Sequence, residues 1–504
     1  MSSPSLSSSL LSSTFRFEIE SITPRLGNLT VYRKSLKKLI QVQTPGLITC
    51  TSRGVIPHLS SDHHLNPPIK WIHVPFESFL EHSPPFPTLH PGPYPLHSSL
   101  GFRPEQHILS MSLRDPADDR DMPPNGNQFV SALCLRGVRK ASPDQWRDYV
   151  SSVQPDLVLA LSDIPFSSAS LSQKRLTKSI ERSASWLANI LRPLPAPATG
   201  PDANLNILVH MAGGIIPAAR QAFSQSLLDP LFDKEAEAIK PLTNLDEGVV
   251  GYSFDLAPLH KSLSPNLTLP TTSKSGFIPF LDLFSTPPAP SSTAQIISLI
   301  RTSLTPLPTT KPRIVHSAGS PHEVLALIRD VGIDLFDAHW AQRAADVGVA
   351  LDFVFPAPVG LPDPELPRQV GHNLYDKRYS HDFSSFADFH PPPAYTPVPY
   401  TRAYVHHLLC THEMSAHTLL ALHNLAVLDM FFVSVRRVLL EEPESFSQHV
   451  AHFEQTYDEK LGVLAEARKL WTEVSLARGK GRLAREREKQ NQDAQNINGY
   501  EYKK

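Results

Sequence analysis

Asp337 is the residue of this chain whose position could support catalysis. It comes directly after a short apolar run at residues 333–336, which has the composition of a buried strand. In a parallel sheet covered by helices, the C-terminal ends of the strands carry the reactive side chains. A carboxylate there can act as a nucleophile or a base. An aspartate after a strand can equally cap a turn or the next helix, so position alone assigns no role.

Other polar residues also follow apolar segments. Residues 44–63 form an apolar strand that ends in a polar turn holding Arg53, His58 and Asp62, and each of these could be an ordinary turn residue. The apolar segment DLVLALSD ends at Asp163. His423 lies in phase with the apolar side chains of residues 419–431 at helical spacing. This phase favours a core histidine, because a metal ligand needs partner ligands.

The elements around these residues alternate between strands and helices. Residues 311–336 predict one strand, helix and strand unit, and helices are expected at residues 142–154, 179–191 and from about residue 217. Repeated alternation predicts a parallel α/β architecture, and the number of units favours a (β/α)8 TIM-type barrel. An open doubly wound sheet is the alternative, but neither GxGxxG nor GxxxxGK[ST] follows any expected strand.

Composition limits the class of protein. The 504 residues are 41% apolar and 19% charged, with a formal net charge of -2, which gives no global signal for nucleic acid. Three distant cysteines, Cys50, Cys134 and Cys410, form neither a disulfide framework nor a cysteine-rich zinc site, and indicate a reducing compartment. No apolar run reaches the roughly 18 residues of a membrane span. The 49 prolines cluster in segments that predict insertions decorating an ordered frame.

Four regions are expected along the chain. Residues 1–14 are a Ser-rich disordered lead-in, and residues 15–372 form the barrel with its Pro-rich insertions. Residues 373–475 form a C-terminal helical subdomain. Residues 476–504 are charged and nearly free of apolar periodicity, so a disordered tail is expected.

Several collinear segments resemble the tRNA-guanine transglycosylases, which exchange guanine in a tRNA anticodon for a modified base. The segments are DLVLALSDIPF with KSIERSASWL, VHMAGGIIPAAR, GIDLFDAHWAQRAADVGVAL, and TRAYVHHLL with LLALHNL. The resemblance as a whole covers most of residues 44–437. The resemblance implies a (β/α)8 barrel, with Asp337 at the nucleophile position and Asp163 at the base-recognition position.

The sequence departs from the family pattern at positions expected to bind the base, catalyse exchange and hold zinc. A family motif that supplies a second catalytic aspartate is replaced here by TSRGVIPHL, and a base-binding Gln is replaced by Ala212. Without these groups the site loses most of the positioning that base exchange needs. The family also binds zinc through three cysteines and a histidine. His423 matches the histidine, whereas the cysteine positions fall at about Pro392, Ala394 and Pro397, so zinc is not expected in this chain.

The TSRGVIPHL segment resembles the non-catalytic accessory subunit of the eukaryotic heteromeric enzyme. This implies a protein that supports exchange of guanine for queuine at wobble position 34 of tRNAs with GUN anticodons. Its expected partners are the catalytic subunit, in a heterodimer, and tRNA. No catalytic residue is expected, and Asp337 would be the relic of a nucleophile. The expected location is the cytoplasm or the periphery of mitochondria.

Two surfaces follow from that resemblance. Residues 403–440 would form the subunit interface through Leu419, Val427, Phe431 and Val435, although internal core packing would give the same pattern. Basic residues could contact tRNA phosphates, or form a solvated face, at Arg33, Lys34, Lys37 and Lys38. Two other hypotheses stay open: an active transglycosylase that uses Asp337, and a barrel scaffold or RNA-binding protein with no transglycosylase partner.

Overall fold

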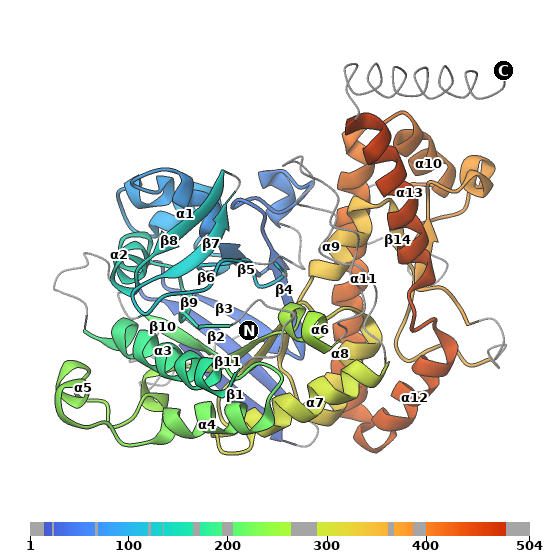
Figure 1. Cartoon of the computed structure of the whole chain (residues 1–504). Helices are drawn as coiled ribbons and strands as arrows, with labels where there is room; N and C mark the ends of the chain where they lie inside the picture. The colour runs from blue at the N-terminus through green and yellow to red at the C-terminus, as the bar shows by residue number, and fades with distance from the viewer. Residues whose placement is uncertain are drawn as a thin grey trace, which may run out of the picture.

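Eight parallel strands close into a barrel in the order in which they occur in the chain (Figure 1). They are β4 (Gly46–Cys50), β5 (Trp71–Pro75), β6 (Ile108–Ser112), β9 (Leu157–Leu159), β10 (Asn206–His210), β11 (Gly251–Asp255), β12 (Arg313–His316) and β13 (Leu335–Asp337). The last strand pairs with the first through Leu335 opposite Gly46, which closes the barrel. The predicted (β/α)8 architecture is confirmed.

The computed structural model describes residues 15–22, 25–65, 69–118, 122–134, 136–164, 172–193, 205–263, 290–360, 367–386 and 400–479. The expected lead-in of residues 1–14 lies outside the described residues, as does the tail beyond residue 479. The three positions aligned with zinc cysteines, Pro392, Ala394 and Pro397, also lie outside them.

Helices cover the outside of the barrel. They are α1 (Pro95–Leu100), α2 (Pro143–Val153), α3 (Gln173–Leu191), α4 (Pro217–Leu228), α5 (Asp233–Ala238), α6 (Ala257–Leu263), α7 (Pro290–Leu304), α8 (Pro321–Val331) and α9 (His339–Asp346). Local sequence sets their ends. Ser142 begins α2 with a capping box that includes Gln145, and Gly332 ends α8 with a φ of +70°, a conformation that glycine adopts without strain.

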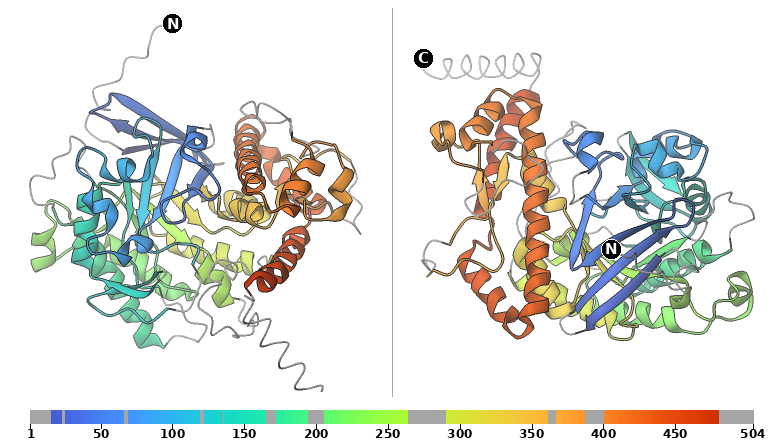
Figure 2. Two further views of the ribbon diagram at one scale, coloured as in Figure 1. Left: turned by 90° about the horizontal axis from the view of Figure 1, so that it is seen from above. Right: turned by 180° about the vertical axis from the view of Figure 1, so that it is seen from behind.

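A three-stranded antiparallel sheet closes the N-terminal end of the barrel (Figure 2). It consists of β1 (Phe15–Ile22), β2 (Arg25–Arg33) and β3 (Lys38–Thr44). Its buried residues Leu29, Val31 and Ile40 share a core with barrel side chains such as Trp71 and Ile314. A β7 (Val130–Cys134) and β8 (Gly137–Ala141) hairpin is inserted after β6, so the predicted strand FVSALCLRG lies outside the barrel.

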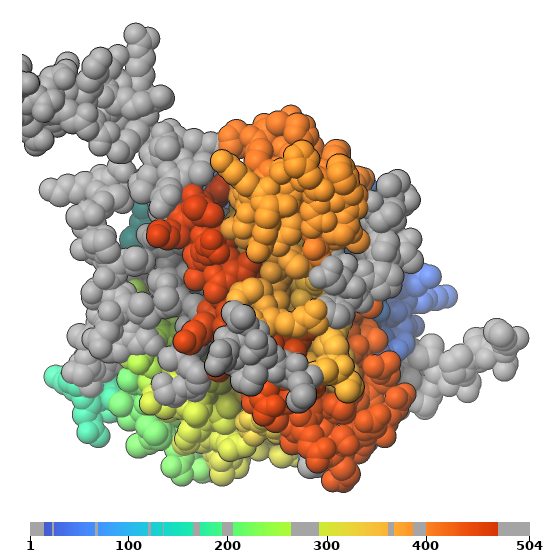
Figure 3. All heavy atoms as spheres, turned by 90° about the vertical axis from the view of Figure 1, so that its right-hand side faces the viewer, coloured from blue at the N-terminus to red at the C-terminus, as the bar shows by residue number. Residues whose placement is uncertain are grey.

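The C-terminal subdomain lies beside the barrel and covers the side seen in Figure 3. It contains β14 (Val349–Leu351), β15 (Gly371–Asn373), α10 (Arg402–Cys410), α11 (Met414–Glu441), α12 (Phe446–Thr456) and α13 (Gly462–Gly479). β14 pairs with β15 and not with a barrel strand, so the subdomain already begins near residue 349. Its central helix, α11, packs against α9 and β4.

Helix α11 is apolar on nearly all sides in its middle turns. Within the described residues, α11 is the helix whose length and composition would be sufficient to cross a membrane. However, 61% of its most apolar stretch is buried inside the fold. Val427, Phe431 and Val435 are 2%, 1% and 0% exposed in this chain. The expectation that these three side chains pack against a partner subunit is therefore wrong, because they pack within their own core.

Candidate functional site

Polar side chains gather at the C-terminal end of the barrel, where catalytic groups of such barrels lie. Asp337 is the last residue of β13, His316 ends β12, and Asp255 ends β11. Asp115 and Asp163 follow β6 and β9 in the chain. Their side chains come from separate strands, so the closed barrel brings together residues far apart in sequence.

The carboxylate of Asp337 is enclosed. Its side chain is 1% exposed, and its Oδ2 accepts a hydrogen bond from the backbone N–H of Ser317 at 2.8 Å. The Nδ1 atom of His316 lies 3.6 Å from the same oxygen. Burial raises the pKa of the neighbouring Cys50 thiol well above its usual value, and the charges of Asp337 and Asp115 raise it further. The surroundings of Asp337 are thus crowded with acidic groups.

The acidic groups interact with one another and with the imidazole of His316 through their charges. Burial raises the pKa of Asp115 to about 6, and the charges of Asp118 and Asp337 add to the effect. Burial lowers the pKa of His316, but hydrogen bonding and charge from Asp337 outweigh burial, so this pKa lies above the ordinary value. This coupling neutralises part of the charge of a buried acidic cluster.

Among the described residues, a small cavity lies at the mouth of the barrel. A cavity of about 40 Å³ lies there, lined by residues that include Ser112, Asp115, His210 and Asp255. Asp337 is not among its lining residues. Ligand sites usually measure about 300–1,000 Å³, so this space is nearer to that of one or two waters than of a purine.

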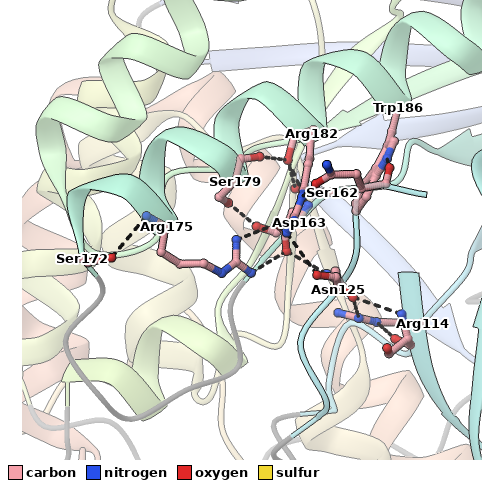
Figure 4. A network of polar contacts seen from close by, with 12 residues as sticks. Arg114, Asn125, Ser162, Asp163, Ser172, Arg175, Ser179, Arg182 and Trp186 are labelled. Carbon is pink, nitrogen blue, oxygen red and sulfur yellow. Dashed lines mark hydrogen bonds and ion pairs between the residues drawn. The ribbon is translucent and has the colours of Figure 1, made fainter. Parts of the chain in front are cut away.

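Asp163 is held by a polar network (Figure 4). Its Oδ2 accepts hydrogen bonds from Arg175 Nη1 at 2.6 Å and Arg182 Nη1 at 3.0 Å. Its Oδ1 accepts from Arg175 Nη2 and Asn125 Nδ2, both at 2.8 Å. An ionised carboxylate has about four acceptor positions, so these four donors occupy all of them. Burial raises the pKa of Asp163, but the Arg175, Asn125 and Arg182 hydrogen bonds outweigh burial and lower it.

The sequence of α3 builds this network. Ser172 accepts a hydrogen bond from the backbone of Arg175 and begins the helix. Arg175, Ser179 and Arg182 are spaced by four and three residues, which places them on one face. The Ser179 hydroxyl donates to the backbone carbonyl of Asp163. The network therefore fixes both the side chain and the backbone of Asp163, and leaves no acceptor of its carboxylate open to a base.

The segment TSRGVIPHL turns sharply after β4. Ser52 and Val55 exchange two backbone hydrogen bonds, and the residues between them, Arg53 and Gly54, have φ values of +53° and +78°. This is the geometry of a tight two-residue hairpin. His58 Nε2 then contacts Asp346 Oδ1 at 2.6 Å at the end of α9. His58 thus joins this segment to the C-terminal part of the chain, while Asp62 is exposed in a 3₁₀ helix at Ser61–Leu65.

His423 is part of the core of the subdomain. It is 7% exposed, and its Nε2 lies 2.8 Å from the carbonyl oxygen of Leu351, to which it donates. The adjacent Asn424 bonds the backbone of Leu351 and of Val349. Among the residues that the structure describes, no three His, Cys, Asp or Glu side chains could hold a metal together. The described residues around His423 therefore do not fit the zinc site of the resemblance.

Similarity to known proteins agrees with this fold. The family model of queuine tRNA-ribosyltransferase matches residues 287–459. A curated relative from Schizosaccharomyces pombe, named queuine tRNA-ribosyltransferase accessory subunit 2, is 25% identical over 443 residues, covering 86% of this chain and 81% of its own. Proteins of the same name from Aedes aegypti and Danio rerio are 25% and 26% identical, over 88% and 86% of this chain and 94% and 97% of theirs.

The chain is thus similar to the queuine tRNA-ribosyltransferase family, through the match at residues 287–459 and through these relatives. Within this family framework, the structure brings Asp163 and Asp337 to the barrel mouth as the motifs predict. It keeps His423 apart from them in α11, where Asn424 and His423 fasten the helix to β14. The roles that the resemblance implies for these positions stay predictions, while the geometry limits what each side chain can contact.

Sequence reasoning missed the partners of Asp163. Asn125 lies in the loop before β7, and Arg175 and Arg182 lie on α3. The spacing of Arg175 and Arg182 on one helical face was a usable signal, because two cations on a face that points to the barrel mouth need a counter-charge. The contribution of Asn125 had no comparable signal, since it arises only when the inserted hairpin folds.

Proposed function

We propose that this chain is the non-catalytic accessory subunit of a heteromeric queuine tRNA-ribosyltransferase, supporting exchange of guanine for queuine at tRNA position 34. The observation that carries the proposal is the occupied carboxylate of Asp163. Asp163 stands at the base-recognition position of the family, and its carboxylate oxygens accept hydrogen bonds from Arg175, Arg182 and Asn125. A carboxylate so engaged would have to lose charge-assisted hydrogen bonds before it could bind a purine edge.

The surroundings of Asp337 support the same proposal. A nucleophile must come within about 3–3.5 Å of the reacting carbon. Asp337 has a side chain 1% exposed, and the neighbouring cavity of about 40 Å³ is not lined by it. For the part of the chain that the structure describes, the active transglycosylase hypothesis requires access to Asp337 and a rearrangement of the Asp163 network, and we do not favour it.

The catalytic subunit is the proposed partner, and we infer that it meets the outer face of α11. Beyond Met414 at its start, the exposed apolar residues on this helix are Met430, Val433 and Leu440, at 38%, 49% and 69% exposure. Their spacing of three and seven residues places them on one stripe. Figure 2 shows α11 running along the surface in the view from behind. An exposed apolar stripe on a core helix is a feature of interfaces between subunits.

The proposed tRNA contact belongs to the assembled complex. Lys37 and Lys38 are exposed at the turn between β2 and β3, so they remain candidates for phosphate contacts. Arg33 does not, because it is 3% exposed and forms a buried ion pair with Asp156. Neither alternative expected for Arg33, a tRNA contact or a solvated face, is therefore found, and its ion pair with Asp156 joins the sheet to the barrel.

Association can be tested by co-purification of the full chain with a catalytic subunit. We expect the wild type and a Phe232→Glu control to form the complex equally well, since Phe232 is an exposed apolar residue away from α11. Val433→Glu should abolish or strongly weaken it, because a carboxylate would be desolvated in an apolar contact. Complex formation by Val433→Glu at wild-type strength would exclude this face, and no complex with any catalytic subunit would exclude the proposed function.

We also propose that the subdomain is stabilised by packing and not by zinc. His423 Nε2 donates to Leu351, and Phe386 packs against the His423 ring at 5.2 Å between centroids. Metal analysis of the purified chain should find far less than one zinc per chain, and a chelator should leave the melting temperature unchanged. About one zinc per chain with a lower melting temperature after chelation would contradict this. The three free cysteines fit the proposed cytoplasmic location, which includes the periphery of mitochondria.

A further inference from the structure

A second cavity lies where the barrel meets the C-terminal subdomain, and its volume is about 380 Å³. The segment after β4, the end of α9, and the helices α11 and α13 contribute its lining. None of the described residues that line it also lines the small cavity at the barrel mouth. Small-ligand sites usually measure about 300–1,000 Å³, are mostly apolar and carry a few well-placed polar groups. This cavity has the volume of such a site.

Much of the lining is apolar or aromatic. Val55 and Pro57 supply aliphatic surface. The ring of His417 lies 5.0 Å from that of His58 between centroids, with planes inclined by 25°. The Trp471 ring lies 6.0 Å from that of His417, with planes inclined by 75°. Aromatic faces bind planar heterocycles by stacking, so this lining favours a flat ligand.

The charged side chains of the cavity already have partners. The Asp346 carboxylate contacts Arg343 Nη1 through Oδ2 at 3.0 Å and His58 Nε2 through Oδ1 at 2.6 Å. Arg343 and Arg468 each have further interactions within the fold, so neither guanidinium is an open anion site. Two guanidinium groups in the lining also disfavour a cationic ligand. These charges together favour a ligand without net charge.

Three polar groups of the lining have hydrogen-bonding capacity left for a ligand. His417 Nδ1 donates to the carbonyl oxygen of Ala345 at 3.0 Å, and burial lowers the pKa of this imidazole, so Nε2 remains an acceptor. Within the described part of the chain, no hydrogen bond occupies that Nε2 or the indole N–H of Trp471. The Asp346 carboxylate uses two of its roughly four acceptor positions. The cavity therefore offers acceptors at Asp346 and His417 and a donor at Trp471.

We propose that this cavity binds an uncharged purine of the guanine type, with its N–H edge at Asp346 and its ring against Trp471 and His417. A carboxylate pairs best with two N–H donors side by side. Guanine presents such a pair, N1–H and the 2-amino group, whereas hypoxanthine lacks the 2-amino group and adenine lacks N1–H. This inference does not depend on the proposed accessory function, because it uses residues that the Asp163 and Asp337 sites do not contain.

The test is calorimetric titration of the full chain with guanosine, inosine, adenosine and GMP. We expect guanosine to bind with a dissociation constant below about 1 mM. Inosine and adenosine should each bind about tenfold or more weakly, because each loses a hydrogen bond to a charged group. GMP should bind no more tightly than guanosine, since both arginines of the lining already have partners.

Variants locate the binding. Val55 lines the cavity and is 54% exposed, so Val55→Trp should fill part of the cavity and block guanosine binding while the core stays intact. The control Val138→Trp makes the same change at an exposed valine outside the cavity and should bind like the wild type. Asp346→Asn should lower the affinity for guanosine to about that for inosine, whereas a purely structural role of Asp346 would weaken both nucleosides alike. Melting temperatures close to that of the wild type establish that each variant folds.

Four results would overturn the proposal. The first is absence of guanosine binding, and the second is guanosine binding that Val55→Trp leaves unchanged. The third is binding of inosine or adenosine as tight as that of guanosine, since the N–H edge would then not be read. The fourth is binding of GMP about tenfold tighter than guanosine, since the cavity would then be an anion site. Each of these leaves complex formation with a catalytic subunit untouched, so failure here is distinguishable from failure of the proposed function.

Discussion

The guanidinium of Arg175 donates one hydrogen bond to each carboxylate oxygen of Asp163, over 2.6 and 2.8 Å. This paired contact, with Arg182 and Asn125, makes Asp163 a structural anchor between α3 and the loop before β7. The position of Asp163 in the fold therefore does not by itself give the function of its carboxylate. Asp163 stands where a base-recognition group is expected, but its carboxylate binds the protein itself.

Asp163→Asn should therefore lower the free energy of unfolding by about 3 kcal/mol. The substitution removes the charge that compensates two arginines and replaces an acceptor with a donor that faces them. Urea denaturation monitored by tryptophan fluorescence measures the change. The control is Glu237→Gln in an exposed ion pair with Lys240, which should leave stability nearly unchanged. Equal effects of the two substitutions would show that the Asp163 network contributes little.

Asp115 predicts a specific dependence of stability on pH. Burial raises its pKa from 3.8 to about 6. Between these pH values the unfolded chain has lost this proton and the folded chain retains it, so Asp115 makes stability fall as pH rises. The difference corresponds to about 3 kcal/mol across the window. Asp115→Asn keeps the acceptor for the Ala117 N–H and removes the titration.

The measurement is the stability of wild type and Asp115→Asn in urea at several pH values. The free energy of unfolding of the variant, relative to that of the wild type, should rise steadily from pH 4 to about pH 6.5. Above that pH the difference should stay constant. Other carboxylates titrate in both proteins and cancel in the comparison. A gap that does not change across this window would mean that Asp115 ionises normally in the folded protein.

Gly54 should be hard to replace. It has a φ of +78°, and a Cβ there would lie 2.6 Å from Leu100 Cδ2 and 2.9 Å from Phe79 Cζ. Gly101 has a nearly equal φ of +75°, but a Cβ there would meet nothing within 4 Å. Gly54→Ala should therefore lower the free energy of unfolding by about 1 kcal/mol or more beyond the effect of Gly101→Ala. Both substitutions introduce backbone strain, and only the first also introduces overpacking. Thermal or urea unfolding of both variants checks this, and equal costs would refute the close contact.

Much of the fold could be predicted from the sequence. The strand at residues 313–316 and the helix after it lie within the predicted unit of residues 311–336, and the structure adds a Ser320 and Pro321 start and a Gly332 end to that helix. The strand ending at Asp163 was placed too long, since β9 stops at Leu159. The residues after it lead to the hydrogen-bond network of Asp163, and these tertiary contacts cannot be predicted from local composition.

The role of α11 could not be predicted for a different reason. Its residues 420–428 are all buried, so the helix has no polar side in its middle turns. A helix that is apolar all round gives no periodic signal for which face meets its own barrel and which meets a partner. Only the packed structure shows that Val427 and Phe431 lie inside and that Val433 lies outside.

The most direct test of the central claim is base exchange into tRNA with guanine at position 34, using labelled base. The assay compares this chain alone, a catalytic subunit alone, and the two together, with wild type and Asp337→Asn forms of this chain. We predict no exchange by this chain alone, exchange by the pair above that of the catalytic subunit alone, and no loss when Asp337→Asn replaces the wild type. Exchange by this chain alone, abolished by Asp337→Asn, would contradict the account.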